Sequence, residues 1–364
     1  MRKHVILLLS IISMLTLAAC GASQTATTGA GGEQPATAAQ PQAQEPATPT
    51  ETTEAKEEAV EGTLSFYTSQ PDADAEKLVT AFKAKYPNVE VSIFRSGTEE
   101  VLSKLQAEKM AGSVQADVLL VADSVSFEIL KEQDMLQPYE SKEHANIPAE
   151  HIDADRTYTG TKVIATAMAV NTNLVQQIPE SWQALLSEEA KDQAMMPSPL
   201  YSGAAAYNVG VFSRTEGMGW EFFEGLKANN MTVTKGNGAV LKAVAGGEKA
   251  YAMVVDFLVA RAEQEGSPVK LIYPVEGVPV ITEPVGIMKD AKNVPAAQAF
   301  VDFILSEEGQ KLQADLGYTP IRPGVEAPKG LKAIDEMKVI SYDIAELFQS
   351  REQDKEKFVT IFGE

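Results

Sequence analysis

The sequence predicts an α/β protein whose chain forms two lobes with a hinged cleft between them. From Gly62 onwards, strand-like and helix-like segments alternate, and a second alternating block occupies roughly residues 172–280. Such alternation is typical of sheets covered by helices. Two long extended segments, Thr161–Asn171 and Thr282–Met288, connect the blocks. Because the chain crosses twice between the blocks, we expect the cleft to lie between two lobes.

The first block has the order βαβαβ, which predicts a parallel, doubly wound sheet. Its strands are expected at Thr63–Tyr67, Val89–Phe94 and Asp117–Val121. Its helices are expected to begin at Gln70-Pro71, at about Thr98 and after Asp123-Ser124. Ser69 is a candidate N-cap for the first of these helices, because a Ser oxygen can accept a bond from a free N–H of the first turn.

The second block contains further strands, expected at Met195–Met196, Tyr251–Val255 and Val269–Tyr273. Helices are expected to begin near Ser202, Trp220 and Gly238, and later at Pro295 and after Ser306. We therefore assign residues 62–166 and 283–325 to lobe 1, residues 167–282 to lobe 2, and residues 326–364 to a C-terminal helical segment.

The N-terminus predicts export and a lipid anchor. A basic start precedes the apolar run Val5–Leu17, which is too short to span a bilayer as a mature helix and is typical of a signal peptide over residues 1–19. The residues up to Cys20 resemble the lipobox of bacterial lipoproteins, which implies lipidation of the Cys20 thiol. Residues 20–61 contain one large apolar side chain, Val60, so we expect a disordered tether.

Composition excludes several classes of protein. The formal net charge of −20 argues against a nucleic-acid partner, because phosphates must be neutralised by clustered cations. A single cysteine excludes an intramolecular disulfide and a Cys-rich metal site. The sequence contains no HExxH, GxSxG or GxxxxGK[ST] motif. We therefore expect neither an enzyme, a cofactor nor a resident metal.

Candidate binding residues follow the expected strands at their carboxyl ends, where open α/β sheets bind ligands. Several of these loops combine hydroxyl groups with helix N-termini, which attract anions, and one contains an Arg suited to phosphate or carboxylate. The candidates are Ser69, Gln70, Arg95, Ser96, Gly97, Thr98, Asp123, Ser124, Tyr201, Ser202, Gly203, Ala204 and Asp256.

Six stretches together resemble the extracytoplasmic solute-binding proteins of ABC importers, in the branch that includes ferric-ion, aminoethylphosphonate and sugar-phosphate binders. They are residues 95–102, 116–119, 122–124, 199–203, 296–310 and 317–322. The similarity covers about Gly62 to Pro323. It implies a type II periplasmic-binding-protein-like fold that closes on a small solute and delivers it to a membrane permease, with the protein acting as an anchored extracytoplasmic monomer.

The ligand is predicted from a departure from the iron binders. Members of this branch that bind ferric ion carry two adjacent tyrosines after the second-lobe strand, where this chain has Asp256-Phe257. Tyr201 and Tyr207 remain as alternative iron ligands. Asp256 suits an ammonium group or sugar hydroxyls, so the sequence favours an organophosphonate or a sugar phosphate. A ferric-iron receptor and a non-transporting adhesion or sensing lipoprotein of the same fold are the alternatives.

Overall fold

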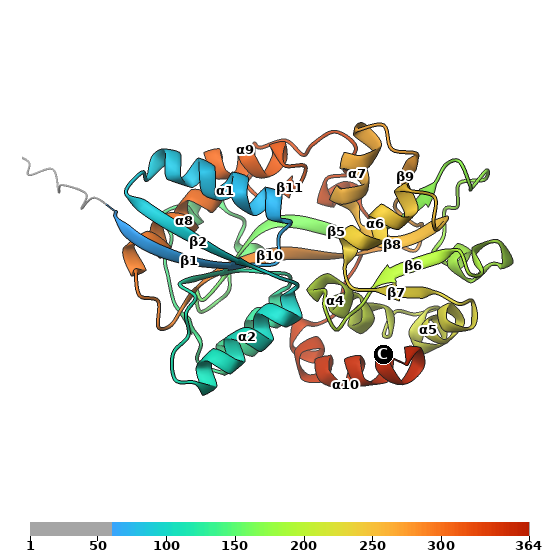
Figure 1. The fold of residues 1–364 in the computed structure, drawn as a ribbon, viewed down its shortest axis with the longest axis horizontal. Helices are drawn as coiled ribbons and strands as arrows, with labels where there is room; N and C mark the ends of the chain where they lie inside the picture. Colours follow the sequence, from blue (N-terminus) through green and yellow to red (C-terminus); the bar gives the residue numbers. More distant parts are fainter. Residues whose placement is uncertain (1–59, 364) are drawn as a thin grey trace, which may run out of the picture. The chain divides into compact units, whose positions relative to one another are not determined.

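A mixed sheet runs through residues 60–363, the part of the chain that the computed structural model describes (Figure 1). Its strands follow the order β2-β1-β3-β10-β5-β8-β6-β7, and four further strands pair with β5 or β10. The strands are β1 (Gly62–Thr68), β2 (Val89–Arg95), β3 (Val118–Leu120), β4 (Leu136–Gln137), β5 (Thr159–Asn171), β6 (Ala194–Pro197), β7 (Thr232–Thr234), β8 (Tyr251–Val255), β9 (Val269–Ile272), β10 (Val278–Met288), β11 (Thr319–Pro320) and β12 (Val339–Ile340).

In both halves of the molecule, helices cover the sheet from above and from below in the view of Figure 1. They are α1 (Asp72–Lys85), α2 (Thr98–Met110), α3 (Ser124–Glu132), α4 (Gly203–Phe212), α5 (Gly219–Ala228), α6 (Asn237–Ala245), α7 (Asp256–Gln264), α8 (Val294–Leu305), α9 (Glu307–Asp315) and α10 (Ile344–Phe362). The predicted strands and helices of both blocks are thus present. The short strands β4, β7, β11 and β12 and the helix α7 were not predicted.

The strand directions divide the sheet into two lobes. In lobe 1, β1 is parallel to both β2 and β3, as the βαβαβ order predicted. In lobe 2, β6 is parallel to β7 and β8. The long strands β5 and β10 lie between these groups and run antiparallel to each other and to their neighbours β8 and β3. The sheet as a whole is therefore mixed, and the parallel order predicted for the first block holds for β1, β2 and β3 but not for their neighbour β10.

The connection between the lobes is formed by β5 and β10, which both extend from one lobe into the other (Figure 1). The register of their pairing shifts between Thr282 and Pro284, the kind of irregularity that bends a strand pair. Every residue of β5 is buried. These two strands are the extended segments that the sequence predicted as the hinge, and they begin earlier than predicted, at Thr159 and Val278.

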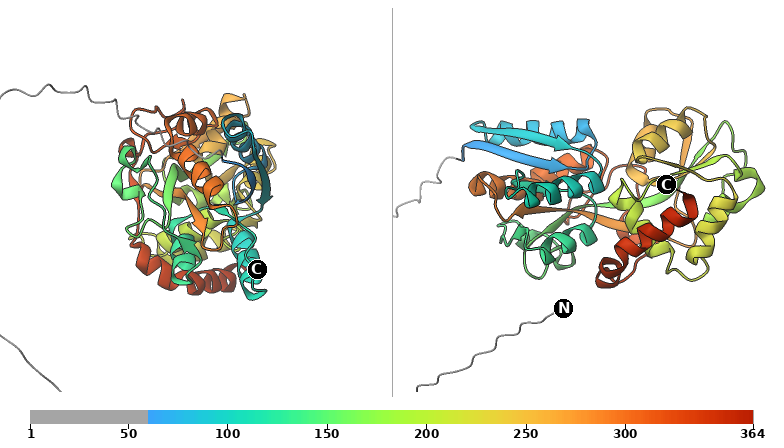
Figure 2. Two further views of the ribbon diagram at one scale, coloured as in Figure 1. Left: turned by 90° about the vertical axis from the view of Figure 1, so that its left-hand side faces the viewer. Right: turned by 60° about the horizontal axis from the view of Figure 1, so that its bottom comes forward.

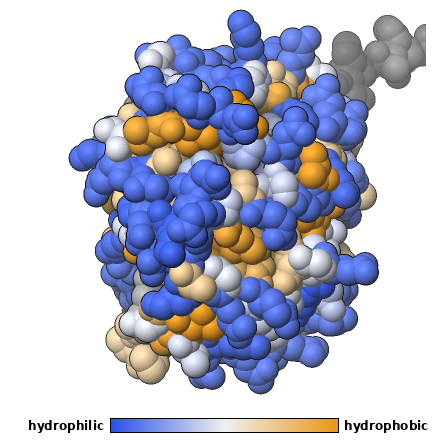
Figure 3. Space-filling model, turned by 90° about the vertical axis from the view of Figure 1, so that its right-hand side faces the viewer, coloured by the Kyte–Doolittle hydropathy of each residue, from blue (hydrophilic) through white to orange (hydrophobic). Residues whose placement is uncertain are grey.

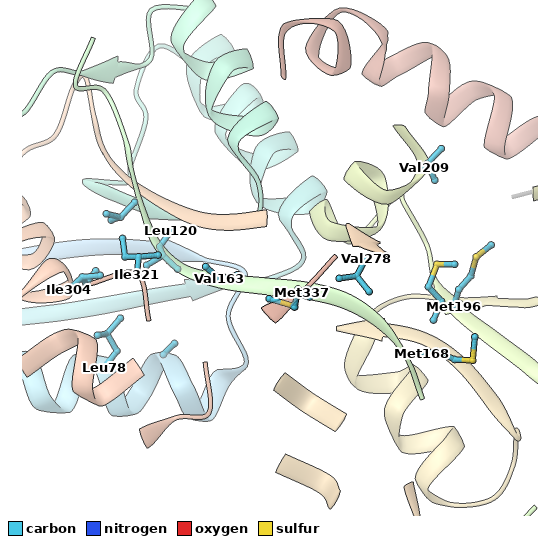
Figure 4. Packing of buried hydrophobic residues seen from close by; sticks show 14 of the residues in the cluster. Leu78, Leu120, Val163, Met168, Met196, Val209, Val278, Ile304, Ile321 and Met337 are labelled. Carbon is cyan, nitrogen blue, oxygen red and sulfur yellow. The ribbon is translucent and has the colours of Figure 1, made fainter. Parts of the chain in front are cut away.

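One hydrophobic cluster extends through both lobes. It contains Leu78 of α1 and Ile304 of α8 in lobe 1, and Met168 of β5 and Met196 of β6 in lobe 2 (Figure 4). Val163 of β5 lies between these two groups (Figure 4). Because burial of apolar surface stabilises at roughly 25 cal/mol per Å², packing along β5 holds the two groups of strands in one body.

Side chains cap the predicted starts of α3, α4 and α9 but not that of α1. The side chains of Asp123, Ser202 and Ser306 accept bonds from backbone N–H groups in the first turns of α3, α4 and α9. Ser69 is not a cap: α1 begins after Pro71, and the Ser69 hydroxyl contacts β10 and the end of β3 instead. Helix α1 starts two residues later than predicted, which frees the Ser69 hydroxyl for the interior.

The C-terminal segment belongs mostly to lobe 2. Strand β12 pairs with the start of β10, and α10 packs along α4 and α5 while also contacting α3 of lobe 1. In the right-hand view of Figure 2, the first turn of α10 (red) is its end nearest to lobe 1. The predicted boundaries at residues 166, 282 and 325 remain a proposal, because the chain passes between the lobes inside β5 and β10.

The end of the molecule formed by lobe 2 has a largely hydrophilic surface with separate apolar groups (Figure 3). Exposed large apolar side chains of this lobe include Leu174, Ile178 and Val275. Between residues 60 and 363, no helix combines the length and apolar character needed to cross a bilayer. The predicted signal peptide, Cys20 and nearly all of the predicted tether lie outside the described residues.

Candidate functional site

A cavity of about 470 Å³ lies between the lobes, a size typical of small-molecule sites. Its walls come from the carboxyl ends of strands in both lobes and from the two strands that join them. The lining residues are Ser69, Gln70, Pro71, Asp72, Arg95, Gly97, Thr98 and Ala122 from lobe 1; Tyr201, Ser202, Gly203, Ala204, Lys235, Gly236, Asn237, Gly238, Ala239, Val255, Phe257 and Leu258 from lobe 2; and Ile164, Ile281, Glu283 and Tyr318.

Two cationic side chains from opposite lobes line this cavity. Arg95, at the end of β2, donates from Nε to the Gln70 carbonyl at 2.7 Å, and its Nη1 lies 3.5 Å from the Tyr201 hydroxyl of lobe 2. Lys235 follows β7, lies 4.7 Å from the centre of the Tyr201 ring and forms an ion pair with Glu100 of α2 at 2.8 Å. Tyr201 therefore lies between a cation of each lobe, and Arg95 also lies 3.9 Å from the Asp72 carboxylate, which lines the cavity too.

Helix N-termini add partial positive charge to the same walls. Helices α1, α2, α4 and α6 all begin at residues that line the cavity. Among these four described helices, α1, α2 and α6 have no side-chain cap, whereas Ser202 caps α4. The first N–H groups of a helix lack intrahelical partners and favour anions. The start of each uncapped helix is therefore suited to donate bonds to an anionic group in the cavity.

The lobe 2 wall is held together by the Asn237 side chain. Its Nδ2 donates to the Ser202 hydroxyl at 3.2 Å, and its Oδ1 accepts from the Val255 backbone N–H at 3.2 Å. These bonds tie together the ends of β6, β7 and β8, since the three residues follow or end those strands. The loops of lobe 2 that face the cavity therefore form one rigid surface.

The side-chain amide of Gln70 is buried and, within residues 60–363, unpaired. Its residue is 1% exposed, its side chain lines the cavity, and neither its Oε1 nor its Nε2 has a hydrogen-bond partner among the described residues. Leaving a buried polar group unpaired costs about 1–3 kcal/mol. The Gln70 amide is therefore an unpaired polar group buried beside the cavity.

The floor of the cavity contains a buried ion pair on the two connecting strands. Glu283 of β10 forms an ion pair with Lys162 of β5, whose side chain is fully buried. The Lys162 ammonium also lies 4.8 Å from the centre of the Tyr318 ring. The Ser69 hydroxyl lies 3.5 Å from Glu283 Oε1. Because Lys162 neutralises Glu283, the floor offers a carboxylate acceptor without adding a net negative charge.

Glycines allow the lobes to touch beside the cavity. A Cβ on Gly97 would lie 2.5 Å from the Tyr201 carbonyl oxygen, and a Cβ on Gly203 would lie 2.3 Å from the Ala122 carbonyl oxygen and 2.9 Å from Thr98 Oγ1. Both contacts join lobe 1 to lobe 2. A backbone hydrogen bond from Glu99 N–H to the Tyr201 carbonyl, at 3.3 Å, also joins the lobes. The structure therefore shows the lobes in contact around the cavity.

Nine of the predicted binding residues line this cavity, and four do not. Those that do are Ser69, Gln70, Arg95, Gly97, Thr98, Tyr201, Ser202, Gly203 and Ala204. Ser96 instead donates to Glu100, Asp123 caps α3 and pairs with Arg351, and Ser124 is the first residue of α3. Tyr207, an alternative iron ligand, is buried within α4, and burial raises its pKa to about 12.

Asp256 is the fourth predicted residue that the structure places outside the lining. The residue is 2% exposed, and Oδ1 accepts from the Ala165 and Phe257 backbone N–H groups at 3.2 and 2.8 Å. Oδ2 accepts from the Tyr273 hydroxyl at 3.0 Å. The expectation that Asp256 faces the ligand is not met, because α7 begins at this residue and its carboxyl is used inside lobe 2.

The buried Asp256 carboxyl predicts a pH-dependent stability. Burial disfavours its charged form and raises its pKa from 3.8 to about 7. A carboxyl with a raised pKa stabilises the fold fully below its unfolded-state pKa, and this stabilisation is lost as the pH rises through the folded-state value. Relative to Asp256→Asn, the wild type should therefore lose on the order of a few kcal/mol between about pH 4 and about pH 8.

Urea unfolding across this pH range measures that difference. Asp290→Asn is the control, because Asp290 is exposed and should give a difference from the wild type that changes little with pH. A wild type that keeps a constant offset from Asp256→Asn at every pH would contradict the buried-carboxyl interpretation.

Two groups stand out among the lining residues that the sequence analysis missed. Lys235, Gly236 and Asn237 follow β7, which has only three residues and carries little periodic signal. Ile164, Ile281 and Glu283 lie inside the connecting strands and Tyr318 follows α9, so no strand-end rule points to them. Among residues 60–363, no three His, Cys, Asp or Glu side chains are grouped so as to hold a metal ion.

Relatives with known structures have this fold. The periplasmic binding protein AfuA from Actinobacillus pleuropneumoniae, with fructose-6-phosphate bound, matches with a TM-score of 0.77 and 24% identity, over 83% of this chain and 98% of that chain. Iron-bound HitA from Pseudomonas aeruginosa matches with a TM-score of 0.71 and 25% identity, over 81% and 99%. These matches confirm the predicted type II periplasmic-binding-protein-like fold.

Sequence comparisons identify the family. A protein of Haemophilus influenzae is 28% identical over 309 residues, which are 81% of this chain and 88% of the relative. A probable ABC transporter periplasmic-binding protein of Sinorhizobium fredii is 24% identical over 276 residues, 73% and 76% of the two chains. The family model described as bacterial extracellular solute-binding protein matches residues 77–339. The chain therefore belongs to the bacterial extracellular solute-binding proteins.

Proposed function

We propose that this protein is the substrate-binding component of an ABC importer, and that it captures a small organophosphonate or sugar phosphate in the cavity between its lobes. The single observation that carries the anionic class is the meeting of Arg95, Lys235 and three uncapped helix N-termini in one cavity. The importer role is supported by the family and by the name of the Sinorhizobium fredii relative.

The anionic group of the solute is expected to bind between Arg95 and Lys235. Charge-assisted hydrogen bonds contribute about 1.5–3 kcal/mol each. A guanidinium can hold two phosphate oxygens at once, and the ammonium and the free N–H groups of α2 and α6 can hold the third. The fructose-6-phosphate in the AfuA structure is a solute of this class.

The rest of the solute is expected to be polar and hydroxylated. Ser69 and Glu283 line the cavity on the lobe 1 side and on β10, and their hydroxyl and carboxylate groups can donate to and accept from solute hydroxyls. Phe257 and Tyr318, whose ring centres are 4.3 Å apart, supply an apolar wall. We therefore expect Glu283, rather than Asp256, to accept hydrogen bonds from an ammonium group or from sugar hydroxyls of the solute.

Ferric iron remains the competing solute, because HitA is iron-bound and two Synechocystis relatives are named iron uptake proteins. Tyr201 lines the cavity, but Tyr207 does not. The hydroxyl of Tyr318, which also lines the cavity, donates to Asp74 at 2.6 Å. A hard cation would therefore have one uncommitted phenol, beside two cationic side chains that repel it.

Thermal unfolding with added solutes tests the proposal. Fructose 6-phosphate or 2-aminoethylphosphonate should raise the unfolding temperature, and neutral fructose should not, because it lacks the anionic group. A rise with ferric citrate alone would establish the iron receptor instead. No shift with any of these solutes would favour a non-transporting adhesion or sensing role.

We also propose that the protein is anchored outside the cytoplasm by a lipid and that it delivers its solute to a membrane permease. Cys20 is the predicted lipid attachment site, and it lies outside the described residues. We expect Cys20→Ser to abolish incorporation of radiolabelled palmitate and to move the protein from the membrane fraction to the soluble fraction, or to leave an uncleaved precursor. A mutant that labels and fractionates like the wild type would contradict the anchor.

A further inference from the structure

The C-terminal helix α10 is fastened to lobe 2 along most of its length. Phe358 packs against Phe223 of α5 with ring centres 6.1 Å apart, and Lys227 Nζ donates to the Phe362 carbonyl at 3.0 Å. Asp354 forms an ion pair with Arg214, just after α4, at 2.8 Å. These apolar and charged contacts join α10 to lobe 2, and its first half also packs against α3 of lobe 1.

Two cations of the same helix reach the other lobe. Arg351 Nη1 contacts Asp123 Oδ2 at 2.8 Å, and its Nη2 contacts Glu99 Oε1 at 2.9 Å. Lys355 Nζ contacts Glu99 Oε2 at 2.9 Å. Asp123 begins α3 and Glu99 lies in the first turn of α2, both in lobe 1. We name these four side chains the α10 cluster.

The α10 cluster is buried where the lobes meet. Arg351 is 4% exposed and Asp123 is 0% exposed. The two acidic residues also follow cavity residues directly, since Thr98 precedes Glu99 and Ala122 precedes Asp123. Thr98 and Ala122 are the lobe 1 residues that Gly203 of lobe 2 approaches. The cluster therefore lies immediately behind the contact that borders the cavity.

We propose that α10 is an interlobe latch, in which Arg351 and Lys355 on lobe 2 hold Asp123 and Glu99 of lobe 1 when the cleft is closed. The three contacts at 2.8–2.9 Å are charge-assisted hydrogen bonds, which opening of the lobes would exchange for bonds to water, and we expect this exchange to favour the paired arrangement. The latch thus biases the protein toward the closed arrangement before any solute binds. This proposal requires no assumption about the solute.

A distance measurement between the lobes tests the latch without a ligand. Spin labels on Met110→Cys of α2 and Val275→Cys of lobe 2, in the full chain with Cys20→Ser, report the distance, because both side chains are exposed. In the otherwise unchanged protein we expect one dominant short distance. With Arg351→Met the share of molecules at this distance should fall at least about twofold, in favour of longer distances.

Matched variants separate the latch from a general effect on α10. Lys357→Met makes the same kind of change on the same helix, but Lys357 is exposed and lies over Trp220 of lobe 2, 4.5 Å from the ring centre. It should leave the distances unchanged. Asp123→Asn with Arg351→Met removes both charges of the most buried pair, keeps an N-cap for α3, and should lengthen the distances as Arg351→Met does.

The latch is wrong if folded Arg351→Met and the double variant both keep the short distance. It is also wrong if Lys357→Met lengthens the distance equally, because the cause would then be a loosened helix rather than the lost ion pairs. If thermal melting shows that neither Arg351 variant folds, the α10 cluster is required for folding rather than for closure, and the proposal fails.

Discussion

Arg95→Met is expected to weaken binding of fructose 6-phosphate, or of whichever anionic solute stabilises the protein, by about ten- to a hundredfold. The guanidinium of Arg95 lines the cavity from lobe 1 and contacts Tyr201 of lobe 2. Its loss removes one or two charge-assisted bonds of about 1.5–3 kcal/mol. Because the methionine keeps much of the apolar bulk, the fold should be retained. Isothermal titration calorimetry measures the change.

The control for this effect is Arg156→Met, since Arg156 is more exposed, pairs with Glu140 at 3.2 Å and does not line the cavity. It removes one positive charge, as Arg95→Met does, so it reports the long-range electrostatic contribution alone. An equal loss of affinity in both variants would mean that Arg95 acts only through overall charge. Unchanged binding in Arg95→Met would place the anionic group elsewhere in the cavity.

Gly203→Ala is expected to weaken solute binding at least tenfold by keeping the lobes apart. The added Cβ would lie 2.3 Å from the Ala122 carbonyl oxygen and 3.0 Å from the Ala122 carbonyl carbon, both backbone atoms of lobe 1. No side-chain rotation can relieve this overlap, so the lobes must separate. The apparent affinity falls in proportion to the population that can still close.

Gly238→Ala is the matched substitution, because it lies on α6 in the same cavity wall and its Cβ would meet nothing within 4 Å. Binding and small-angle scattering should distinguish the two variants. With solute present, Gly203→Ala should keep a larger radius of gyration than the wild type, and Gly238→Ala should not. A Gly203→Ala protein that closes fully and binds normally would contradict the steric role of this glycine.

The cavity-lining residues at strand ends were predictable because a local rule places them. Arg95 ends β2 and Thr98 follows it, while Tyr201 and Ser202 follow β6. A predicted strand followed by a polar loop was enough to identify them, without knowledge of the fold. Asp256 satisfied the same rule, but the structure places it outside the cavity lining. The backbone N–H groups of its chain neighbour Phe257 and of the distant Ala165, together with the Tyr273 hydroxyl, donate to its carboxyl, and only tertiary packing decides which way such a side chain is used.

The sequence by itself determined the alternating α/β order, the two connecting strands, most helix starts and half or more of the polar residues that meet in the cavity. Periodicity, capping and turn chemistry act over a few residues, so they can be recognised from the sequence alone. Tertiary structure alone decided that Lys235 and Glu283 join the site and that Arg351 of α10 pairs with Asp123, 228 residues earlier. Ion pairs and cavity walls form between segments distant in sequence, and their partners are chosen by packing and burial rather than by any local pattern.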